Sequence, residues 1–150
     1  MDKIFSDEFF MKEALKQARL AIEKDEVPVG AVIVCNNQVI AKAHNSMEML
    51  NDSTAHAELI AITSACHALG SKYLNECTIY VTVEPCVMCS GAIFWSQLSR
   101  LVYGAPDEKA GFTKYNPTML AQRINIKRGV LEDECAHIIS SFFKSKRIKH

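Results

Sequence analysis

The stretches Thr54-Ala55-His56-Ala57-Glu58 and Glu84-Pro85-Cys86-Val87-Met88-Cys89 decide what kind of domain this chain can form. They contribute one histidine and two cysteines, which are side chains that bind zinc. Three protein ligands leave the fourth position of a tetrahedral ion open to water, as metal-assisted hydrolysis requires. Glu58 has no evident structural role two residues from the histidine, so it is a candidate general base. The predicted zinc ligands are His56, Cys86 and Cys89.

Both stretches lie where helices are expected to begin. Cysteines three residues apart share one face of a helix, and the N–H groups at a helix start favour the thiolate form that zinc needs. Pro85 suits the first position of a helix that runs to about Gln97, because its missing N–H costs nothing there. Thr54 is expected to cap a helix over residues 55–69, which Gly70 closes. We expect these two helix starts to meet at one edge of a sheet, where α/β folds place their ligands.

Alternating strand and helix signals surround the two stretches and predict a single α/β domain over residues 1–150. Apolar and β-branched runs predict strands at residues 27–35, 38–43, 77–83, 100–104 and 124–130. Helical spacing predicts helices at residues 7–24, 55–69, 85–97 and from 131 onward, with a short helix before the last strand. Ser6 is the expected cap of the first helix, and Asn36-Asn37 the expected hairpin turn. Residues 44–53 are expected to form an irregular loop. One mixed sheet covered by helices on both faces follows.

Composition places the chain among cytoplasmic globular proteins. No apolar run approaches the roughly 18–20 residues of a membrane span, and the start Met1-Asp2-Lys3 is not typical of a signal peptide. Without an export signal, the six cysteines are expected to be reduced thiols and not a disulfide framework. Four of them lie in apolar patterns and are expected to be buried small side chains: Cys35, Cys66, Cys77 and Cys135.

The net charge of zero gives no global electrostatic case for binding nucleic acid. All 17 acidic residues precede position 144, however, and the chain from there to its end carries four basic residues. A short basic end of this kind can contact phosphates, although a solvated helix end has the same composition. The residues concerned are Lys144, Lys146, Arg147 and Lys149.

Histidine-x-glutamate followed by proline-cysteine-x-x-cysteine is the signature of zinc-dependent nucleobase deaminases. Over nearly its whole length the chain resembles the bacterial tRNA-specific adenosine deaminases, through Val27–Val32, Thr54–Glu58, Glu84–Cys89 and the ending Gly129–Phe143. The resemblance implies the cytidine deaminase-like fold, a three-layer α/β/α arrangement around a five-stranded mixed sheet. It also implies one Zn2+ per subunit and a homodimer. The implied reaction converts adenosine to inosine at the wobble position of the tRNA anticodon stem-loop.

The resemblance further implies roles for individual residues. His56, Cys86 and Cys89 would bind zinc. Glu58 would carry the proton from water to the departing ammonia. Asn45 matches an asparagine that hydrogen-bonds the purine, which suits an amide able to donate and accept. The other residues assigned to the substrate are Val29, Asp107, Lys109 and Phe143. Positions 107 and 109 match a loop that contacts flanking nucleotides, and the aromatic ring is expected to stack on a base.

Two alternative functions remain open. Lys109-Ala110-Gly111-Phe112 resembles bacterial guanine deaminases of the same fold, which favours a free purine or pyrimidine as the alternative substrate, guanine before cytosine. Those enzymes, however, have an acidic pair where this chain has Thr113-Lys114, and phenylalanine in place of Val29. The alternative from another class is a zinc-stabilised binding module without catalysis, which would need a fourth zinc ligand. The candidates for that ligand are His44, Cys66 and His67.

Overall fold

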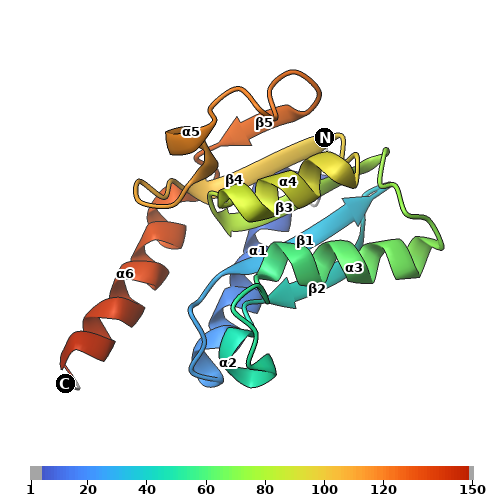
Figure 1. Cartoon of the computed structure of the whole chain (residues 1–150). Helices are drawn as coiled ribbons and strands as arrows, with labels where there is room; N and C mark the ends of the chain where they lie inside the picture. The colour runs from blue at the N-terminus through green and yellow to red at the C-terminus, as the bar shows by residue number, and fades with distance from the viewer. Residues whose placement is uncertain (1–4, 149–150) are drawn as a thin grey trace.

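A mixed sheet of five strands forms the centre of the computed structural model, which describes residues 5–148 (Figure 1). Its strands are β1 (Gly30–Cys35), β2 (Gln38–His44), β3 (Cys77–Val83), β4 (Arg100–Ala105) and β5 (Asn125–Arg128). They lie in the order β2-β1-β3-β4-β5, with β1 antiparallel to both of its neighbours and the other pairs parallel. The predicted five-stranded mixed sheet is therefore confirmed. Met1-Asp2-Lys3 and Lys149, which entered the predictions above, lie outside the described residues.

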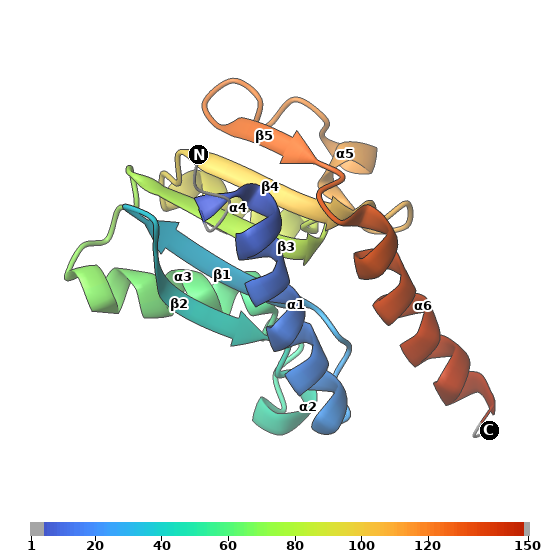
Figure 2. The same cartoon turned by 180° about the vertical axis from the view of Figure 1, so that it is seen from behind.

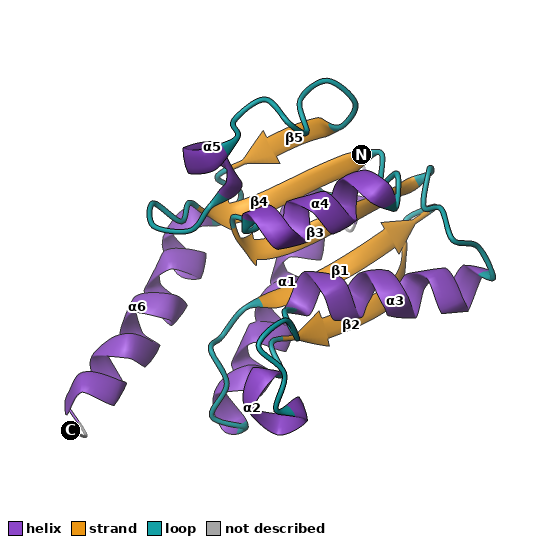
Figure 3. Ribbon diagram, in the orientation of Figure 1, coloured by secondary structure: helices purple, strands orange, loops and turns teal. Residues whose placement is uncertain are grey.

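Helices cover both faces of this sheet and complete a three-layer α/β/α fold (Figures 1 and 2). One face carries α1 (Asp7–Glu23) and α6 (Glu132–Ile148), and the other carries α3 (Ala57–Leu69) and α4 (Val87–Trp95). Two short helices, α2 (Met47–Leu50) and α5 (Phe112–Tyr115), lie in connecting segments (Figure 3). The last is the short helix expected before the final strand. No helix among residues 5–148 is both long and apolar enough to cross a bilayer.

Helix α2 lies in the stretch that was predicted to be an irregular loop, and a distant carboxylate explains the difference. A four-residue helix leaves its first N–H groups without partners of its own. The carboxylate of Glu26, which is 1% exposed, accepts the N–H groups of Glu48 (3.0 Å) and Met49 (2.7 Å). Because this acceptor lies 22 residues away from Glu48, the local sequence pattern carries no sign of it.

Helix α1 begins where predicted and is tied to the sheet through its first residue. Ser6 caps the helix by accepting an N–H of its first turn at 3.1 Å. The carboxylate of Asp7 accepts two hydrogen bonds from Arg100 (2.7 and 2.8 Å). It also accepts hydrogen bonds from Tyr80 (2.8 Å) and Lys127 (3.0 Å). The Arg100 guanidinium holds the pKa of Asp7 well below its usual range, so this acid stays charged between α1 and the sheet.

The β1–β2 hairpin turns at Asn36 and Asn37, whose φ angles of 53° and 62° lie in the left-handed region. Asparagine tolerates this region, which two-residue hairpin turns require, so the predicted turn is confirmed. At the other end of β1, Gly30 leaves no room for a side chain, because a Cβ there would overlap the carbonyl oxygen of Ala14. Helix α1 therefore packs directly against the main chain of β1.

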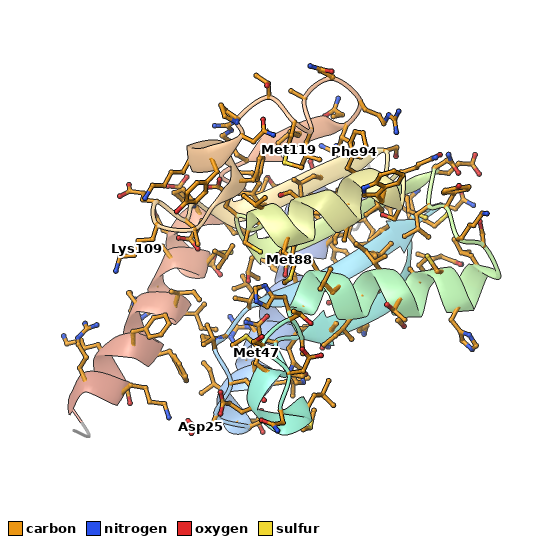
Figure 4. All side chains as sticks on the ribbon, in the orientation of Figure 1. Asp25, Met47, Met88, Phe94, Lys109 and Met119 are labelled. Carbon is orange, nitrogen blue, oxygen red and sulfur yellow. The ribbon has the colours of Figure 1, made fainter. Side chains whose placement is uncertain are left out.

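The apolar core lies in two layers, one on each side of the sheet. On the side of α3 and α4, the partly buried Phe94 and Met119 both pack against the core (Figure 4). All six cysteines are free thiols, as expected. Of the four cysteines expected to be buried, Cys77 and Cys135 are buried, whereas Cys35 and Cys66 are only partly buried.

Candidate metal centre and active site

The starts of α3 and α4 meet at the edge of the sheet where β1 begins and β2 and β3 end, as expected (Figure 3). His56 takes the cap position of α3, with an extended backbone (φ −79°, ψ 151°). The predicted cap, Thr54, was wrong, because its hydroxyl donates to Asp52 (2.7 Å). Asn45 supplies the acceptor instead, through Oδ1, which receives the Ala57 N–H at 2.9 Å. The imidazole of His56 is therefore not needed as a cap and faces α4.

Cys86 and Cys89 lie in the first turn of α4. Cys86 takes the cap position (φ −74°, ψ 174°), and its Sγ accepts the Cys89 N–H at 3.5 Å. Pro85 therefore precedes the helix and is not its first residue, contrary to the prediction. The helix also ends at Trp95, short of the predicted Gln97. Because a sulfur at the cap can accept a first-turn N–H, the ligand residue itself starts the helix.

The three predicted ligands converge in space. Nδ1 of His56 lies 3.7 Å from Sγ of Cys86 and 3.5 Å from Sγ of Cys89. All three ligand atoms lie within 4.8 Å of one another. Zinc bonds of about 2.0–2.1 Å to nitrogen and about 2.3 Å to sulfur, at tetrahedral angles, would separate N and S by about 3.5 Å. The cluster therefore has the donor set and the spacing of a zinc site.

A fourth protein ligand is missing from this cluster across residues 5–148. His44, one candidate, has its Nδ1 within 2.9 Å of the Asn45 carbonyl oxygen. Cys66 and His67, the other two, lie near the far end of α3 and are not members of the group. A closed structural zinc site, which the binding-module alternative required, is not formed by the described side chains. Three ligands with an open position fit hydrolysis instead.

The electrostatics of the cluster favour negative charge on one of the two sulfurs, that of Cys86. The pKa of Cys86 is lowered to about 4, chiefly by the hydrogen bond from the Cys89 thiol and then by the one to His56. The pKa of Cys89 is raised, first by its contact with Cys86 and then by burial. The pKa of His56 is raised because Cys86 lies against its ring. Because the two sulfurs compete for one proton, a divalent cation bound between them would stabilise both as thiolates.

Glu58 lies in the first turn of α3 and is 4% exposed. Burial raises the pKa of its carboxyl to about 7, and the nearby His56 opposes this rise. The carboxyl contacts the Cys89 thiol but is not part of the ligand group. Its position beside the metal ligands, and not among them, agrees with the direction expected from the sequence. A carboxyl with this pKa can both take up and release a proton at neutral pH.

Asn45 has only part of its amide left for a substrate. Its Oδ1 is occupied by the Ala57 N–H, so the two amide N–H groups remain as donors. The sequence predicted an amide that both donates and accepts, and capping of α3 occupies one of the two lone pairs of the amide oxygen. The backbone N–H of Asn45 donates to the Val29 carbonyl at 3.1 Å, which places Val29 beside it at the start of β1.

A cavity of about 250 Å³ lies next to Asn45, and α6 contributes one of its walls. Phe142 and Lys146 line it from α6. Met47, which is labelled in Figure 4, lines it from α2. Phe143, the aromatic residue assigned from the sequence, is not among the lining residues and is 42% exposed. Its ring packs edge-on against Phe142 with centroids 5.4 Å apart. Phe142 was assigned no role of its own from the sequence, and its position at this cavity depends on how α6 packs.

Asp107 and Lys109 lie in the loop after β4, which follows the metal ligands in the sequence. The carboxylate of Asp107 accepts the N–H groups of Lys109 (3.1 Å) and Ala110 (3.0 Å), so it shapes its own loop. The side chain of Lys109 is exposed and points away from the sheet (Figure 4). Glu84, to which sequence reasoning gave no role although it lay in a quoted stretch, is buried and holds this loop.

Three clustered metal-binding side chains with no fourth protein ligand, a buried acid beside them and an amide donor nearby are typical of a nucleobase deaminase site. Comparison with known proteins finds the same class, because residues 5–147 match the MafB19-like deaminase family. The chain is 47% identical over 148 residues to the tRNA-specific adenosine deaminase of Bacillus subtilis, a match that covers 95% of this chain and 92% of that protein. The chain belongs to the deaminase family that includes these tRNA-specific adenosine deaminases.

Solved structures agree with the fold. A structure of a tRNA:A34 deaminase, described for A-to-I editing at the wobble position of transfer RNA, is 44% identical with a TM-score of 0.81. That match covers 86% of this chain and 97% of the other. The guanine deaminase of Nitrosomonas europaea is 26% identical with a TM-score of 0.81, covering 91% of this chain and 84% of that one. The predicted cytidine deaminase-like fold is confirmed.

Proposed function

We propose that this protein is a zinc-dependent hydrolase that converts adenosine to inosine at the wobble position of tRNA anticodons. One observation supports the proposal above all: the ligand atoms of His56, Cys86 and Cys89 lie within 4.8 Å of one another, and Glu58 is buried beside them. The 47% identity to a tRNA-specific adenosine deaminase over 95% of the chain supports the choice of substrate.

The mechanism assigns one task to each residue of the centre. His56, Cys86 and Cys89 would hold the zinc ion, which acts as a Lewis acid toward the attacking water. Glu58 takes one proton from the water and delivers it to the ring nitrogen N1 as the water oxygen bonds to C6. It then takes the remaining proton of the new C6 hydroxyl and delivers it to the amino group, which leaves as ammonia when the C–N bond breaks. Adenosine and water thus give inosine and ammonia. The raised pKa of Glu58, about 7, suits a group that must both accept and donate this proton.

Substrate binding is assigned to residues around the same edge. The amide N–H groups of Asn45 donate to an acceptor on the purine, and Val29 lies beside this amide. Asp107 and Lys109 contact the nucleotides that flank the target. Phe143 stacks on an exposed base, as its 42% exposure allows. Lys144, Lys146 and Arg147 on α6 supply positive charge toward the RNA phosphates.

We also propose that the protein acts as a homodimer. Val87, Met88 and Trp95 on α4 are 43%, 38% and 77% exposed, which is a large apolar surface for one short helix. Exposed apolar patches of this kind mark interaction sites. Sedimentation of the purified protein should give a dimer, and Trp95→Lys should give a monomer. A monomer of the unchanged protein at micromolar concentration would exclude the proposal.

A single deaminase domain over residues 1–150 that works in the cytoplasm completes the proposal. One sheet that takes up all five strands supports a single domain. Six free thiols support a reducing compartment. Limited proteolysis that yields one protected fragment would agree with the domain assignment, and two stable fragments would contradict it.

Deamination of free guanine is the second candidate, because a guanine deaminase shares this fold at a TM-score of 0.81. Purified protein should be given an anticodon stem-loop, guanine and cytosine in separate reactions, and ammonia should be measured. We expect ammonia from the stem-loop alone. Ammonia from guanine but not from the stem-loop would replace the proposed substrate. A protein that binds zinc but releases ammonia from none of the three substrates would favour the non-catalytic binding module.

A further inference from the structure

Glu84 is a buried acid at the end of β3, two residues before the first cysteine of the metal centre. Its side chain is 5% exposed. Its carboxylate accepts three hydrogen bonds, from the Asp107 N–H (3.0 Å), the Thr113 N–H (3.0 Å) and the Thr113 hydroxyl (2.6 Å). A buried carboxylate is costly unless it is satisfied in this way. All three donors belong to the segment 105–115, and none comes from β3, the strand that Glu84 follows.

Further contacts join the same two segments. Gly111 approaches Glu84 so closely that a Cβ there would overlap the carboxylate. Gly111 also pairs with Cys86 in an isolated antiparallel bridge, and the Phe112 N–H donates to the Pro85 carbonyl at 2.9 Å. Residues 84–86 therefore bind the second half of the loop along their whole length.

The tip of the loop is tied to these contacts through Asp107. Its backbone N–H donates to Glu84, while its side chain accepts the N–H groups of Lys109 and Ala110. Its carbonyl oxygen accepts the Gly111 N–H at 2.9 Å. The residues from 107 to 111 thus form one small turn, whose position depends on the Glu84 carboxylate.

We propose that Glu84, with Thr113, is a positioning residue that fixes the 105–115 loop relative to the zinc ligands and so sets the affinity for the nucleotides flanking the target. Glu84 is buried beneath the loop and acts through it, without touching the substrate. The assignment of flanking nucleotides to this loop rests on the proposed function. Thr113 replaces the first residue of the acidic pair in the guanine deaminases that the sequence resembles, and here its hydroxyl has a defined partner in Glu84.

Glu84→Gln is the decisive variant, because it replaces one acceptor oxygen with an amide that must face an N–H donor. Hydrogen exchange tests the contact directly, without any activity measurement. We expect the amides of Asp107 and Thr113 to exchange at least about tenfold faster in Glu84→Gln, while α3 keeps its protection and the zinc content stays unchanged. Unchanged exchange at both amides would overturn the proposal.

Kinetics on two RNAs separate positioning of the loop from damage to the metal centre. On an anticodon stem-loop, KM should rise about tenfold, equivalent to about 1.4 kcal/mol and typical of a lost charge-assisted hydrogen bond, while kcat stays within about twofold. On a stem-loop whose flanking nucleotides are abasic, the variant and the unchanged protein should have the same KM. An equal rise on both RNAs, or a fall in kcat with loss of zinc, would overturn the proposal.

Thr113 supplies the matched controls. Thr113→Val removes only the hydroxyl contact and should raise KM on the stem-loop by about threefold, as expected for one lost hydrogen bond. Thr113→Ser keeps the hydroxyl and should restore the original KM. If Glu84→Gln does not fold, the Val and Ser variants decide, and equal KM values for the two would overturn the proposal. If the unchanged protein does not deaminate the stem-loop, the proposed function fails, whereas the exchange experiment still tests the loop contact.

Discussion

The side chain of Asn45 serves the fold with its oxygen and, in the proposed function, the substrate with its nitrogen. Asn45→Ala and Asn45→Asp should separate these tasks. Alanine removes the acceptor that the Ala57 N–H meets at 2.9 Å in a buried position, at the start of the helix next to His56. Aspartate keeps an acceptor oxygen there but replaces both amide donors with a second oxygen.

The stability effects follow from the cap. Loss of a capping acceptor costs about 0.5–2 kcal/mol, and a protein of this size loses about 2–4 °C of Tm per kcal/mol. Asn45→Ala should therefore lower Tm by about 3–6 °C, if the loss is about 1.5 kcal/mol. Asn45→Asp should stay within about 2 °C of the unchanged protein, because its charge lies near the positive start of α3. Thermal unfolding followed by circular dichroism measures both values.

The activity effects follow from the lost donor. Without it, an acceptor on the purine is left unpaired, at about 1–3 kcal/mol, so kcat/KM on the stem-loop should fall about 5-fold to 150-fold in both variants. Inosine formation measures the rate. Two results would refute the reasoning: a Tm for Asn45→Asp as low as that of Asn45→Ala, or an Asn45→Asp protein with full activity.

Three further predictions address the proton carrier, the first helix and its packing. Glu58→Gln should lower kcat at least about 100-fold while zinc content and Tm are retained, and persistent turnover would exclude the proposed mechanism. Asp7→Asn should cost about 1–2 kcal/mol of unfolding free energy at pH 7 by urea titration. Because its partner Arg100 depresses the pKa of Asp7, this difference should hold above about pH 5 and shrink progressively as pH falls below about 4. A difference that is undiminished at pH 2 would contradict it. Gly30→Ala should destabilise by at least about 1–3 kcal/mol, since its Cβ overlaps the main chain of α1, and an unchanged Tm would refute that packing.

Patterns within a few residues carried most of the fold. The hairpin at Asn36 and Asn37 was predictable because both residues tolerate the left-handed backbone that the turn needs. The pair Cys86 and Cys89 was predictable because helical geometry brings residues three apart onto one face. Strands and helices were recognised for the same reason, since their periodicity is a local property of the sequence.

Contacts between distant residues decided what the local patterns missed. Helix α2 exists because Glu26 accepts its first N–H groups from 22 residues away. Helix α3 is capped by Asn45 and not by Thr54, because the Ala57 N–H donates to the side chain of Asn45, 12 residues earlier in the chain. In the same way, the packing of α6 decides which of its faces lies nearest to Asn45. This packing places Phe142 at the cavity.

The sequence by itself determined the candidate chemistry of this protein: residue types and their spacing indicate the proposed zinc ligands and the acid beside them, and the resemblance of these stretches to a known family indicates the deaminase class. Tertiary structure alone decided how that chemistry is held in place. The Asn45 oxygen is assigned to the fold and its nitrogen left for a ligand only because α3 starts against it. Glu84 gains its role only because Asp107 and Thr113, 23 and 29 residues further along, bring their N–H groups to its carboxylate. A buried acid takes its function from the donors around it, and those donors are set by the fold.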